Sequence, residues 1–505
     1  MAHRSSVWLK EKFNNMLLIK PSIHAESQSR IISPFVYKTF PTSLGFLAGY
    51  LRKYNGIVPE IIDEDIVFLD RGRLRELLNK NNGLKIAGMT SVTINSVRAY
   101  QLAKMIKEID SEYIIILGGI HATVLPEECL QNSVIDIVVR GEGEETLSEV
   151  IEYIQNGRDY RQLKGISYRR GNYFIHNPNR PLLDIDKIPP FPYDIFDTTY
   201  TFYRDFGTVI SSRGCPYDCI FCSQRAISGQ WYRSVAVEKI LDEVGLLIKK
   251  YNQKKIWFMD DNFLVDKKRA FSLIAGIIEK SFHKKAVFVA EMRGDSVTYE
   301  ILSKMKEANF QMVSFGMETG SQRLLDLIDK KETVEDNIQA IEMAHKLRIK
   351  TSATFIFGLP TETRKERLFT AKLARSIPLD DARFNVAVPY PGTKLFQLAK
   401  QENRLHIKPG WSNFNVQFYM FGDDIPYLPE NTSRDVLIRD TFLANLRFNF
   451  RFKTLINFIT SPITGGMVLT LPEKWYLSPR QIWRIFRLML FILKRFLRVL
   501  FRHKK

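Results

Sequence analysis

The segment Arg213-Gly214-Cys215-Pro216-Tyr217-Asp218-Cys219-Ile220-Phe221-Cys222-Ser223 decides the fold of much of this chain. It directly follows a predicted strand at 208–211, so it forms a loop at the carboxyl end of a strand. In α/β barrels the active site lies at that edge. Three thiolates on one short loop can bind three irons of a cubane cluster and leave the fourth iron without a protein ligand.

Zinc is the main alternative for these thiols. Structural zinc takes four ligands, usually as CxxC pairs, whereas the spacing here is CxxxCxxC. The remaining cysteine, Cys129, lies in the preceding domain, on a predicted helix, where we expect a core residue. The pattern therefore favours an iron–sulfur cluster, with zinc and incidental cysteines as the other interpretations.

The sequence around the cysteines alternates between strands and helices. Helices are predicted between the strands, for example at 237–251 and 334–347. The pattern indicates an α/β unit that is open or partly closed as a barrel. Its six predicted strands are 208–211, 256–259, 287–290, 313–315, 353–357 and 384–388.

The N-terminal part shows the same alternation. Five apolar runs separated by helical segments predict a parallel, doubly wound, Rossmann-like sheet. Ligands on such sheets bind outside the carboxyl ends of the strands, and glycines stand at two of those ends, where they let a flat ligand approach the backbone. The runs are 16–19, 58–63, 84–89, 113–117 and 135–139.

We expect five segments along the chain: the first α/β domain at 1–160, a proline-rich linker with a small hairpin at 161–204, the second α/β domain at 205–394, a mostly helical region at 395–472 and a basic helix at 473–505.

The cysteine segment resembles the radical SAM superfamily, whose signature is CxxxCxΦC with an aromatic residue before the last cysteine. Phe221 fills that position. The resemblance implies a partial (β/α)6 barrel and a 4Fe-4S cluster on Cys215, Cys219 and Cys222. Its open iron chelates S-adenosyl-L-methionine (SAM), whose reductive cleavage gives a 5′-deoxyadenosyl radical.

Further residues extend this resemblance to about 205–390. The segment Gly316-Met317-Glu318 is similar to a Gly-Gly-Glu-like motif that binds the methionine amino group, with Met317 departing from glycine. Glu291 and Arg293 stand where the family places groups near the ribose and carboxylate of SAM. Phe357, within Ile356-Phe357-Gly358-Leu359-Pro360, resembles the segment that packs on adenine.

The first domain resembles a cobalamin-binding domain. The matching residues for cobalamin are Thr90, Ser91, Gly118, Gly119, His121, Gly141, Glu142 and Gly143. The Asp-x-His-x-x-Gly motif that supplies a cobalt ligand elsewhere is absent around His24, so the resemblance implies no histidine on cobalt. Hydrogen bonds that fix a turn are the alternative role for His121, and helix capping is the alternative for Glu142. A domain that kept its fold and lost cobalamin is a further alternative.

The basic excess is concentrated at the C-terminus. The net charge is +18, from 73 Lys and Arg and 55 Asp and Glu. Ten cations and no acid follow Glu473, and most of them share one helical face opposite aromatic and aliphatic residues. This pattern predicts an interfacial helix on a membrane surface. Docking on the protein itself or on a partner is the alternative, and the wide apolar face argues against nucleic acid.

The N-terminus lacks the apolar core of a signal peptide. Unpaired thiols agree with a cytoplasmic protein, which we expect to be peripheral on the inner face of the cell membrane. The expected partners are a hydrophobic or lipid-like substrate and an electron donor such as flavodoxin or ferredoxin.

Together these features predict a cobalamin-dependent radical SAM enzyme that functionalises an unactivated carbon, with methyl transfer through methylcobalamin as the leading reaction. Similar architectures occur in anaerobic Mg-protoporphyrin monomethyl ester cyclase and in hopanoid- and lipid-modifying enzymes, so oxidative cyclisation is the alternative. A methylthiotransferase that modifies RNA would need three further cysteines. A membrane-tethered cobalamin sensor without catalysis is the non-enzymatic alternative.

Overall fold

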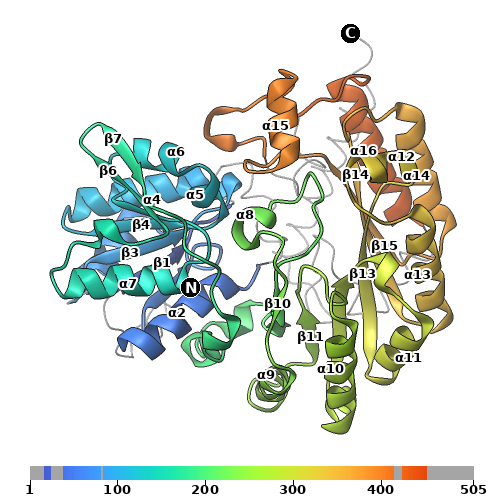
Figure 1. Ribbon diagram of the computed structural model, residues 1–505, viewed down its shortest axis with the longest axis horizontal. Coiled ribbons are helices and arrows are strands. Elements are labelled where there is room, and N and C mark those ends of the chain that lie inside the picture. Colours follow the sequence, from blue (N-terminus) through green and yellow to red (C-terminus); the bar gives the residue numbers. More distant parts are fainter. Residues whose placement is uncertain (1–15, 24–37, 81–82, 415–423, 452–505) are drawn as a thin grey trace, which may run out of the picture. The chain divides into compact units, whose positions relative to one another are not determined.

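The computed structural model describes residues 16–23, 38–80, 83–414 and 424–451. They form two compact units (Figure 1). The first unit contains the described residues up to Phe206 together with Ala226–Ser228. The second contains Gly207–Arg225 and the described residues from Gly229 onward.

Five parallel strands form the centre of the first unit, in the order β2-β1-β3-β4-β5. They are β1 (Met16–Lys20), β2 (Glu60–Asp63), β3 (Ile86–Thr90), β4 (Ile114–Gly118) and β5 (Ile137–Val139). The helices are α2 (Thr42–Asn55), α3 (Arg71–Asn79), α4 (Ser96–Ile109), α5 (Ile120–Val124), α6 (Pro126–Gln131) and α7 (Glu144–Gln155).

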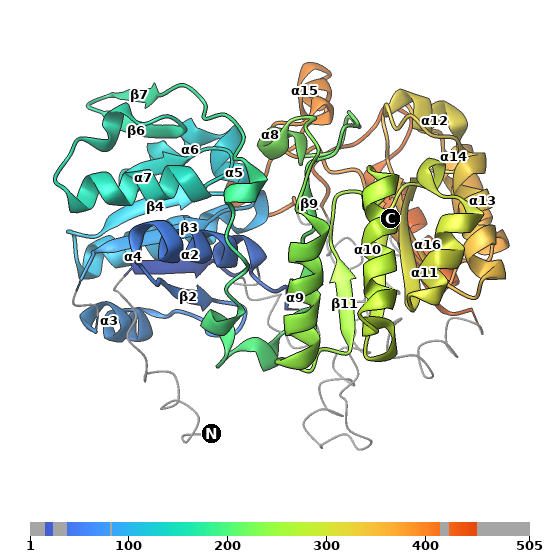
Figure 2. The ribbon, with the colours of Figure 1, turned by 60° about the horizontal axis from the view of Figure 1, so that its bottom comes forward.

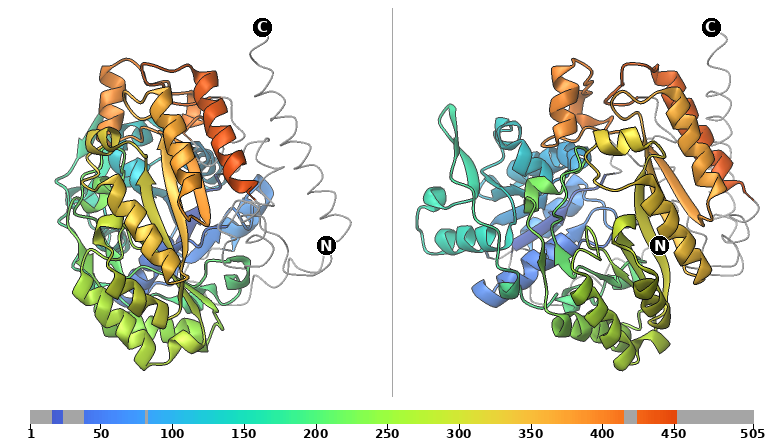
Figure 3. Two further views of the ribbon diagram at one scale, coloured as in Figure 1. Left: turned by 90° about the vertical axis from the view of Figure 1, so that its right-hand side faces the viewer. Right: turned by 45° about the vertical axis from the view of Figure 1, so that its right-hand side comes forward.

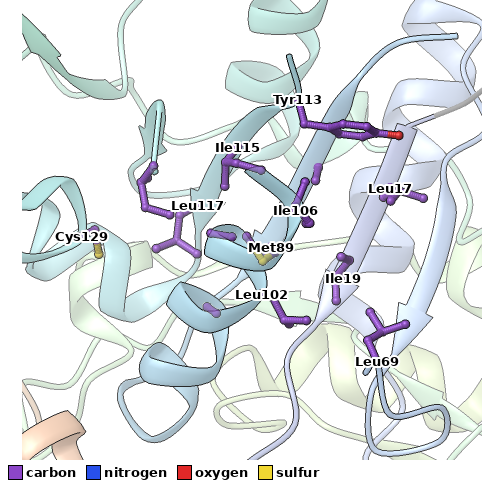
Figure 4. Close-up of a cluster of buried hydrophobic side chains, with 14 of the residues drawn as sticks. Leu17, Ile19, Leu69, Met89, Leu102, Ile106, Tyr113, Ile115, Leu117 and Cys129 are labelled. Atoms are coloured by element: carbon purple, nitrogen blue, oxygen red, sulfur yellow. The ribbon is translucent and has the colours of Figure 1, made fainter. Parts of the chain in front are cut away.

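Apolar side chains on both faces explain this sheet. Alternate residues of β1 enter two different cores: Leu17 and Ile19 pack in one, and Met16 and Leu18 in the other. Figure 4 shows the first core, where Leu102 and Ile106 of α4 lie over the sheet. A strand buried on both faces is continuously apolar, so the predicted parallel, doubly wound sheet is confirmed.

The small hairpin extends this sheet. Strand β6 (Ile166–Arg170) pairs antiparallel with β5, and β7 (Tyr173–His176) pairs antiparallel with β6. The sequence places the hairpin in a linker because its turn, Gly171-Asn172, is visible locally. The pairing with β5 depends on residues far away in the chain, such as Ile137 opposite Tyr168. Three short 3-10 turns follow: Ile185–Lys187, Tyr193–Phe196 and Tyr200–Phe202.

The second unit contains a parallel sheet of six strands in the order β15-β14-β13-β12-β11-β8. All six strands predicted from the sequence are present. They are β8 (Thr208–Val209), β11 (Lys255–Phe258), β12 (Val287–Met292), β13 (Phe310–Glu318), β14 (Lys350–Phe357) and β15 (Asp381–Val386). The sheet starts at β8 and ends at β15, in chain order, as expected for an open barrel. A two-stranded antiparallel sheet joins β9 (Ser212–Arg213) and β10 (Arg233–Ser234).

Helices cover one face of this sheet. Figure 2 shows α10, α11 and α13 in succession along it. Phe258, Phe288 and Phe310 stack beneath these helices, with ring centroids 5.4 to 6.1 Å apart. The helices of the second unit up to this point are α9 (Val237–Lys249), α10 (Lys267–Glu279), α11 (Tyr299–Glu307), α12 (Gln322–Leu327), α13 (Val334–Lys346) and α14 (Arg364–Ser376), and most of α8 (Arg225–Ser228) belongs to the first unit.

The C-terminal region adds two helices, α15 (Lys394–Gln401) and α16 (Arg434–Asn449). Helix α16 lies beside α14 (Figure 3) and against β15. The Asn445 side chain accepts a hydrogen bond from the Phe384 amide at 3.1 Å and donates one to its carbonyl at 2.8 Å. In the part of the chain that the structure describes, every helix is too short or too polar to cross a bilayer. The predicted basic helix at 473–505 lies outside the described residues.

Candidate active site

A cavity of about 350 Å³ opens at the carboxyl edge of the six-stranded sheet. The ends of five strands, β11 to β15, and the cysteine loop form its walls. It is lined by Phe221, Asp261, Glu291, Met292, Arg293, Ser314, Phe315, Gly316, Glu318, Lys330, Thr354, Ile356, Asn385, Val386, Ala387, Val388 and Tyr390. The cavity thus lies where the fold class predicts an active site.

Two adjacent aspartates, the buried Asp260 and the exposed Asp261, fix the start of the cysteine loop. Asp260 accepts hydrogen bonds from the amides of Ser211 and Ser212, at 2.7 and 2.9 Å. Asp261 accepts one from the amide of Gly214 at 3.0 Å. Gly214 has a φ of +85°, a conformation that favours glycine. The first turn of the loop is therefore held by the end of β11.

The other end of the loop is tied to two more segments. The amide of Ile220 donates to the carbonyl of Ile328 at 3.1 Å, and its carbonyl accepts from the amide of Leu395 at 2.9 Å. Asp218 pairs with Lys394 at 2.6 Å. Because both ends are anchored, the three cysteines have defined positions beside the cavity.

The three thiols have the chemistry that an iron–sulfur cluster needs. All three are free, with Cys222 exposed and the other two half-buried. Burial raises the pKa of Cys219 to about 11, and the cations Lys330 and Arg293 oppose that rise. Soft thiolates facing fixed positive charge suit an anionic cluster. No three His, Cys, Asp or Glu side chains among the described residues could hold a single metal ion, so the cluster assignment rests on the thiols and the family.

Arg293 and Lys330 belong to a buried ionic cluster beneath the cavity. Lys330 pairs with Glu318 at 2.9 Å and lies 3.7 Å from Glu332. Arg293 lies 3.6 Å from Glu332 and donates to the carbonyl of Lys330 at 2.6 Å. Its guanidinium also lies 3.6 Å from the ring centre of Tyr217, within the cysteine loop. The cluster thus connects the loop to the ends of β12 and β13.

The backbone at the end of β13 is irregular. The register with β14 shifts between Gly316 and Glu318, and Glu318 has a φ of +58°, which is rare for a residue with a side chain. A Cβ on Gly316 would lie 2.5 Å from Oε1 of Glu318 and 2.8 Å from Nζ of Lys330. A side chain at 316 would therefore displace the Glu318–Lys330 pair from its present position. Backbone strain of this kind is typical of functional sites.

Of the seven residues predicted for SAM, five line the cavity: Phe221, Glu291, Arg293, Gly316 and Glu318. Met317 is fully buried and does not line it. Phe357, from the segment predicted to pack on adenine, is also buried and packs against Phe384, with ring centres 5.3 Å apart, so its contact with SAM stays a prediction. Side chains alternate along a strand, and the cavity receives Thr354 and Ile356 instead.

Sequence reasoning missed Asp261, Lys330 and Asn385 as cavity residues. Asp260-Asp261 at the end of a predicted strand was a usable signal, because polar pairs at carboxyl ends are typical of binding sites. Lys330 gave no such signal, since it lies after α12. Glu291 was predicted, and burial raises the pKa of its carboxyl group.

The donor set fits SAM. Carboxylates, a guanidinium and an amide share one cavity, and they match the amino, carboxylate and hydroxyl groups of that molecule. The loop that carries the three thiols contributes Phe221 to the same cavity.

The predicted cobalamin residues gather at the carboxyl edge of the first unit's sheet. Ser91, after β3, donates its amide hydrogen to the carbonyl of Gly118 at the end of β4, at 2.8 Å. Gly119 has a φ of +93°, and a Cβ there would lie 2.6 Å from the carbonyl oxygen of Ser91. Gly141, after β5, donates its amide hydrogen to Thr123 at 3.0 Å. Three neighbouring strands thus end in close-packed backbone that a flat ligand can approach.

His121 is fully buried. Its ring nitrogens lie 3.2 Å from the hydroxyl of Tyr100, 3.3 Å from Glu128 and 3.4 Å from Thr93. These contacts favour the turn-fixing role over contact with a corrin, which stays a prediction.

Two other residues of this unit have structural contacts. The carboxylate of Glu142 accepts a hydrogen bond from the amide of Leu183 at 2.9 Å. Cys129 is a buried core residue, as predicted, and burial raises its pKa to about 12.

Comparisons with known proteins agree with both units. Residues 209–374 match the radical SAM superfamily, and residues 31–151 match the B12 binding domain. An uncharacterized methyltransferase from Pyrococcus horikoshii is 33% identical over 425 residues, which cover 82% of this chain and 89% of that protein. The chain therefore belongs to the radical SAM enzymes that carry an N-terminal B12-binding domain.

Two further relatives extend this comparison. The anaerobic magnesium-protoporphyrin IX monomethyl ester cyclase from Cereibacter sphaeroides is 28% identical, over 71% of this chain and 60% of the cyclase. The structure of the cobalamin-dependent S-adenosylmethionine radical enzyme OxsB with aqua-cobalamin bound has a TM-score of 0.68 at 18% identity, over 97% of this chain and 72% of OxsB. The cofactors of this enzyme are a 4Fe-4S cluster, SAM and cobalamin.

Proposed function

We propose that this enzyme methylates an unactivated carbon of a hydrophobic substrate. The observation that carries the proposal is the cysteine loop, anchored at both ends beside a polar cavity at the carboxyl edge of its sheet. The methyltransferase from Pyrococcus horikoshii supports the reaction type.

The cysteine loop and the cavity divide the work between them. Cys215, Cys219 and Cys222 hold the cluster, and Phe221 closes the adjoining wall. When bound, the cluster, SAM and cobalamin supply radical formation and a transferable methyl group. The protein binds these groups, orients them and excludes water from the reacting carbon.

Cavity side chains orient SAM. Glu291 and Asp261 are the acceptors for its amino and hydroxyl groups, and Arg293 is the donor for its carboxylate. Ile356, from the segment predicted to pack on adenine, supplies the apolar contact for that ring. Asn385, from the end of β15, offers both a donor and an acceptor.

The carboxyl edge of the first unit holds cobalamin through its backbone. Thr90, Ser91, Gly118, Gly119 and the segment Gly141-Glu142-Gly143 approach the corrin and its phosphate tail. Small residues at neighbouring strand ends suit the approach of a large flat group to the backbone.

The composition of the C-terminal tail supports a substrate associated with a membrane. The relative from Cereibacter sphaeroides is named for a porphyrin ester, a large apolar molecule. Because that relative is a cyclase, oxidative ring closure is a second candidate reaction. Flavodoxin or ferredoxin is the proposed electron donor.

Anaerobic reconstitution with iron, sulfide and cobalamin tests the proposal. We expect the full chain to show cluster absorbance, to retain a corrinoid and to form 5′-deoxyadenosine from SAM. Cys222→Ala should abolish the cluster and SAM cleavage, whereas the matched variant Cys129→Ala, in the core of the first unit, should keep both. Retained cleavage in Cys222→Ala contradicts the cluster assignment.

Lipid extracts of cells with and without the gene separate the two reactions. Methylation adds one methylene to the product mass, and cyclisation removes two hydrogens. Full cofactor loading without any SAM cleavage would instead indicate a sensor.

A further inference from the structure

The amino edge of the six-stranded sheet, opposite the cavity, is strongly basic. In a parallel sheet, each crossover helix returns the chain to the amino ends of the strands. All turns from helix to strand therefore lie along this edge. In the second unit these turns are 248–255, 279–286, 304–309, 345–350 and 375–381.

Hydrogen bonds join these five turns into one continuous surface, which we call the amino-edge surface. Each turn, or the first strand residue that follows it, contacts the next turn within 3.0 Å. The bonds run from Val287 N to the Lys254 carbonyl, from Asn309 Nδ2 to the Ala286 carbonyl, from Lys306 Nζ to the Arg348 carbonyl and from Asp380 N to the Thr351 carbonyl.

The turns carry eleven Lys and two Arg against four Asp or Glu, a net charge of +9 (13 − 4). Two of the four acids, Asp380 and Asp381, are buried and accept hydrogen bonds from β14. A third, Glu307, pairs with Lys304 at 2.6 Å. Three of the four acids are therefore paired or hydrogen-bonded within the fold, and the exposed charge of the surface is mostly that of its lysines. Its exposed lysines are Lys249, Lys250, Lys254, Lys280, Lys284, Lys285 and Lys346.

The last described residues, Phe450 and Arg451, also lie at this surface. Arg451, after α16, donates to the carbonyl of Leu379 at 3.1 Å, within the last of the five turns. Its neighbour Phe450 is 68% exposed. The sequence that continues from here contains the tail with ten cations and no acid after Glu473. The surface and the start of the tail thus have the same sign of charge.

We propose that the amino-edge surface binds the headgroups of an anionic lipid bilayer. The inference goes beyond the proposed function, which assigns membrane contact to the tail, and it does not depend on the reaction. A surface with eleven lysines and two arginines suits diffuse attraction to anionic headgroups, whereas specific phosphate sites favour the arginine fork. Exposed Phe450 beside Arg451 offers an apolar contact that a nucleic acid backbone does not need.

One consequence concerns orientation within the second unit. The strands run from the amino-edge surface to the edge that holds the cavity. A bilayer on this surface therefore leaves the cavity facing away from the headgroups, so a substrate held in that bilayer must leave it, wholly or in part, to reach the cavity.

The test compares two triple variants of the full chain, each lowering the charge by three. Lys254→Gln/Lys284→Gln/Lys285→Gln changes the amino-edge surface. Lys267→Gln/Lys268→Gln/Lys365→Gln changes exposed lysines at the starts of α10 and α14, on the opposite edge. Sedimentation with phosphatidylglycerol vesicles measures binding, and phosphatidylcholine vesicles give the baseline.

We expect the amino-edge variant to bind phosphatidylglycerol vesicles at least tenfold more weakly, and the opposite-edge variant to bind within twofold of the wild type. Equal binding by all three proteins overturns the proposal. Loss of binding to an RNA oligonucleotide with unchanged vesicle binding also overturns it. Formation of 5′-deoxyadenosine, measured on the same samples, separates this result from the proposed function, because its absence in all three proteins contradicts only the latter.

Discussion

Lys330 lines the cavity, and its positive charge also acts on Cys219 of the cysteine loop. Its ammonium group is buried, which disfavours the charged form, but Glu318 and Glu332 more than offset burial and raise its pKa. Lys330 in turn opposes the rise in the pKa of Cys219. One buried cation therefore balances two glutamates and favours a thiolate that binds the cluster.

Replacing this cation should destabilise the second unit. Lys330→Met leaves Glu318 and Glu332 without their shared partner, and breaking a buried ion pair costs about 3–5 kcal/mol. Thermal unfolding of the anaerobic protein measures the loss. The control is the neighbouring Lys331→Met, because the Lys331 side chain is 71% exposed and its pairing with Asp329 contributes little. Equal stability of the two variants would show that Lys330 is not needed for charge balance.

Adding one methyl group at Gly119 tests whether the carboxyl edge of the first unit's sheet binds cobalamin. We expect Gly119→Ala to reduce corrinoid retention strongly, because its Cβ would lie 2.6 Å from the carbonyl oxygen of Ser91. Gly171→Ala is the control: its φ is +61° and a Cβ there meets nothing within 4 Å. Gly171→Ala carries the cost of a left-handed conformation, about 1–2 kcal/mol, whereas Gly119, with a φ of +93° and a ψ of −178°, lies in a region that essentially only glycine adopts, so its variant carries a larger backbone cost. Corrinoid content after purification with cobalamin should fall in Gly119→Ala alone.

Single site residues can be predicted from the sequence when they belong to a local motif. Residues that reach the cavity only because distant segments fold together cannot. The cysteines and Glu291 stand in recognisable positions. Phe357 was predicted within a segment that resembles the one that packs on adenine, whereas Ile356 is the residue of that segment that lines the cavity. Lys330 reaches the cavity through a loop after α12, and no local pattern signals that position.

At the scale of elements, α14 begins with a network that depends on pH. Thr363 and Glu366 form a capping box, and Arg323 and Ser321 donate to the same carboxylate at 2.8 to 3.0 Å. Hydrogen bonding from Arg323 is the main cause that lowers the pKa of Glu366 to about 2, from an ordinary value of 4.5. The folded-state pKa lies below the unfolded one. Glu366 therefore stabilises the fold above about pH 4.5 and loses that effect as the pH falls toward 2.

Glu366→Gln should lower stability by about 1 kcal/mol at pH 7, the usual value of a helix cap. The difference from the wild type should shrink as the pH falls from 4.5 toward 2, and unfolding midpoints at several pH values measure it. Glu335→Gln, in the first turn of α13, is the control, since its carboxylate accepts from Gln339 on the exposed surface. A difference that stays constant with pH would contradict the role given to the carboxylate charge.

Element types could be predicted well, because apolar runs and helical spacing are local. All six strands of the second unit and the five parallel strands of the first were predicted. The hairpin was assigned to a linker, since pairing with β5 is non-local. The start of α6 at Pro126 was predicted, and the short helix α5 before it was missed. Helices α5 and α6 are separated at Leu125, where the ring of Pro126 disfavours the helical conformation.

At the scale of the whole molecule, two regions account for the basic excess. The tail after Glu473 carries ten cations, and the amino-edge turns carry a net +9, so all other residues have a net charge of −1. The sequence located the tail, because its charges are contiguous. The amino-edge charges lie in five separate turns, and only the parallel topology brings them together.

A chain that ends at Pro472 tests how the two regions act together. Removing the tail deletes both its apolar contacts and its ten cations, so we expect binding to phosphatidylglycerol vesicles to fall at least tenfold. The remaining binding should disappear on the further change Lys254→Gln/Lys284→Gln/Lys285→Gln. It should also weaken between about 0.15 and 1 M salt, as the screening length shrinks from about 8 to 3 Å.

Unchanged sedimentation of the truncated chain would contradict the predicted interfacial helix. The truncated chain should still form 5′-deoxyadenosine, because the cysteine loop and the cavity lie within residues 213–390.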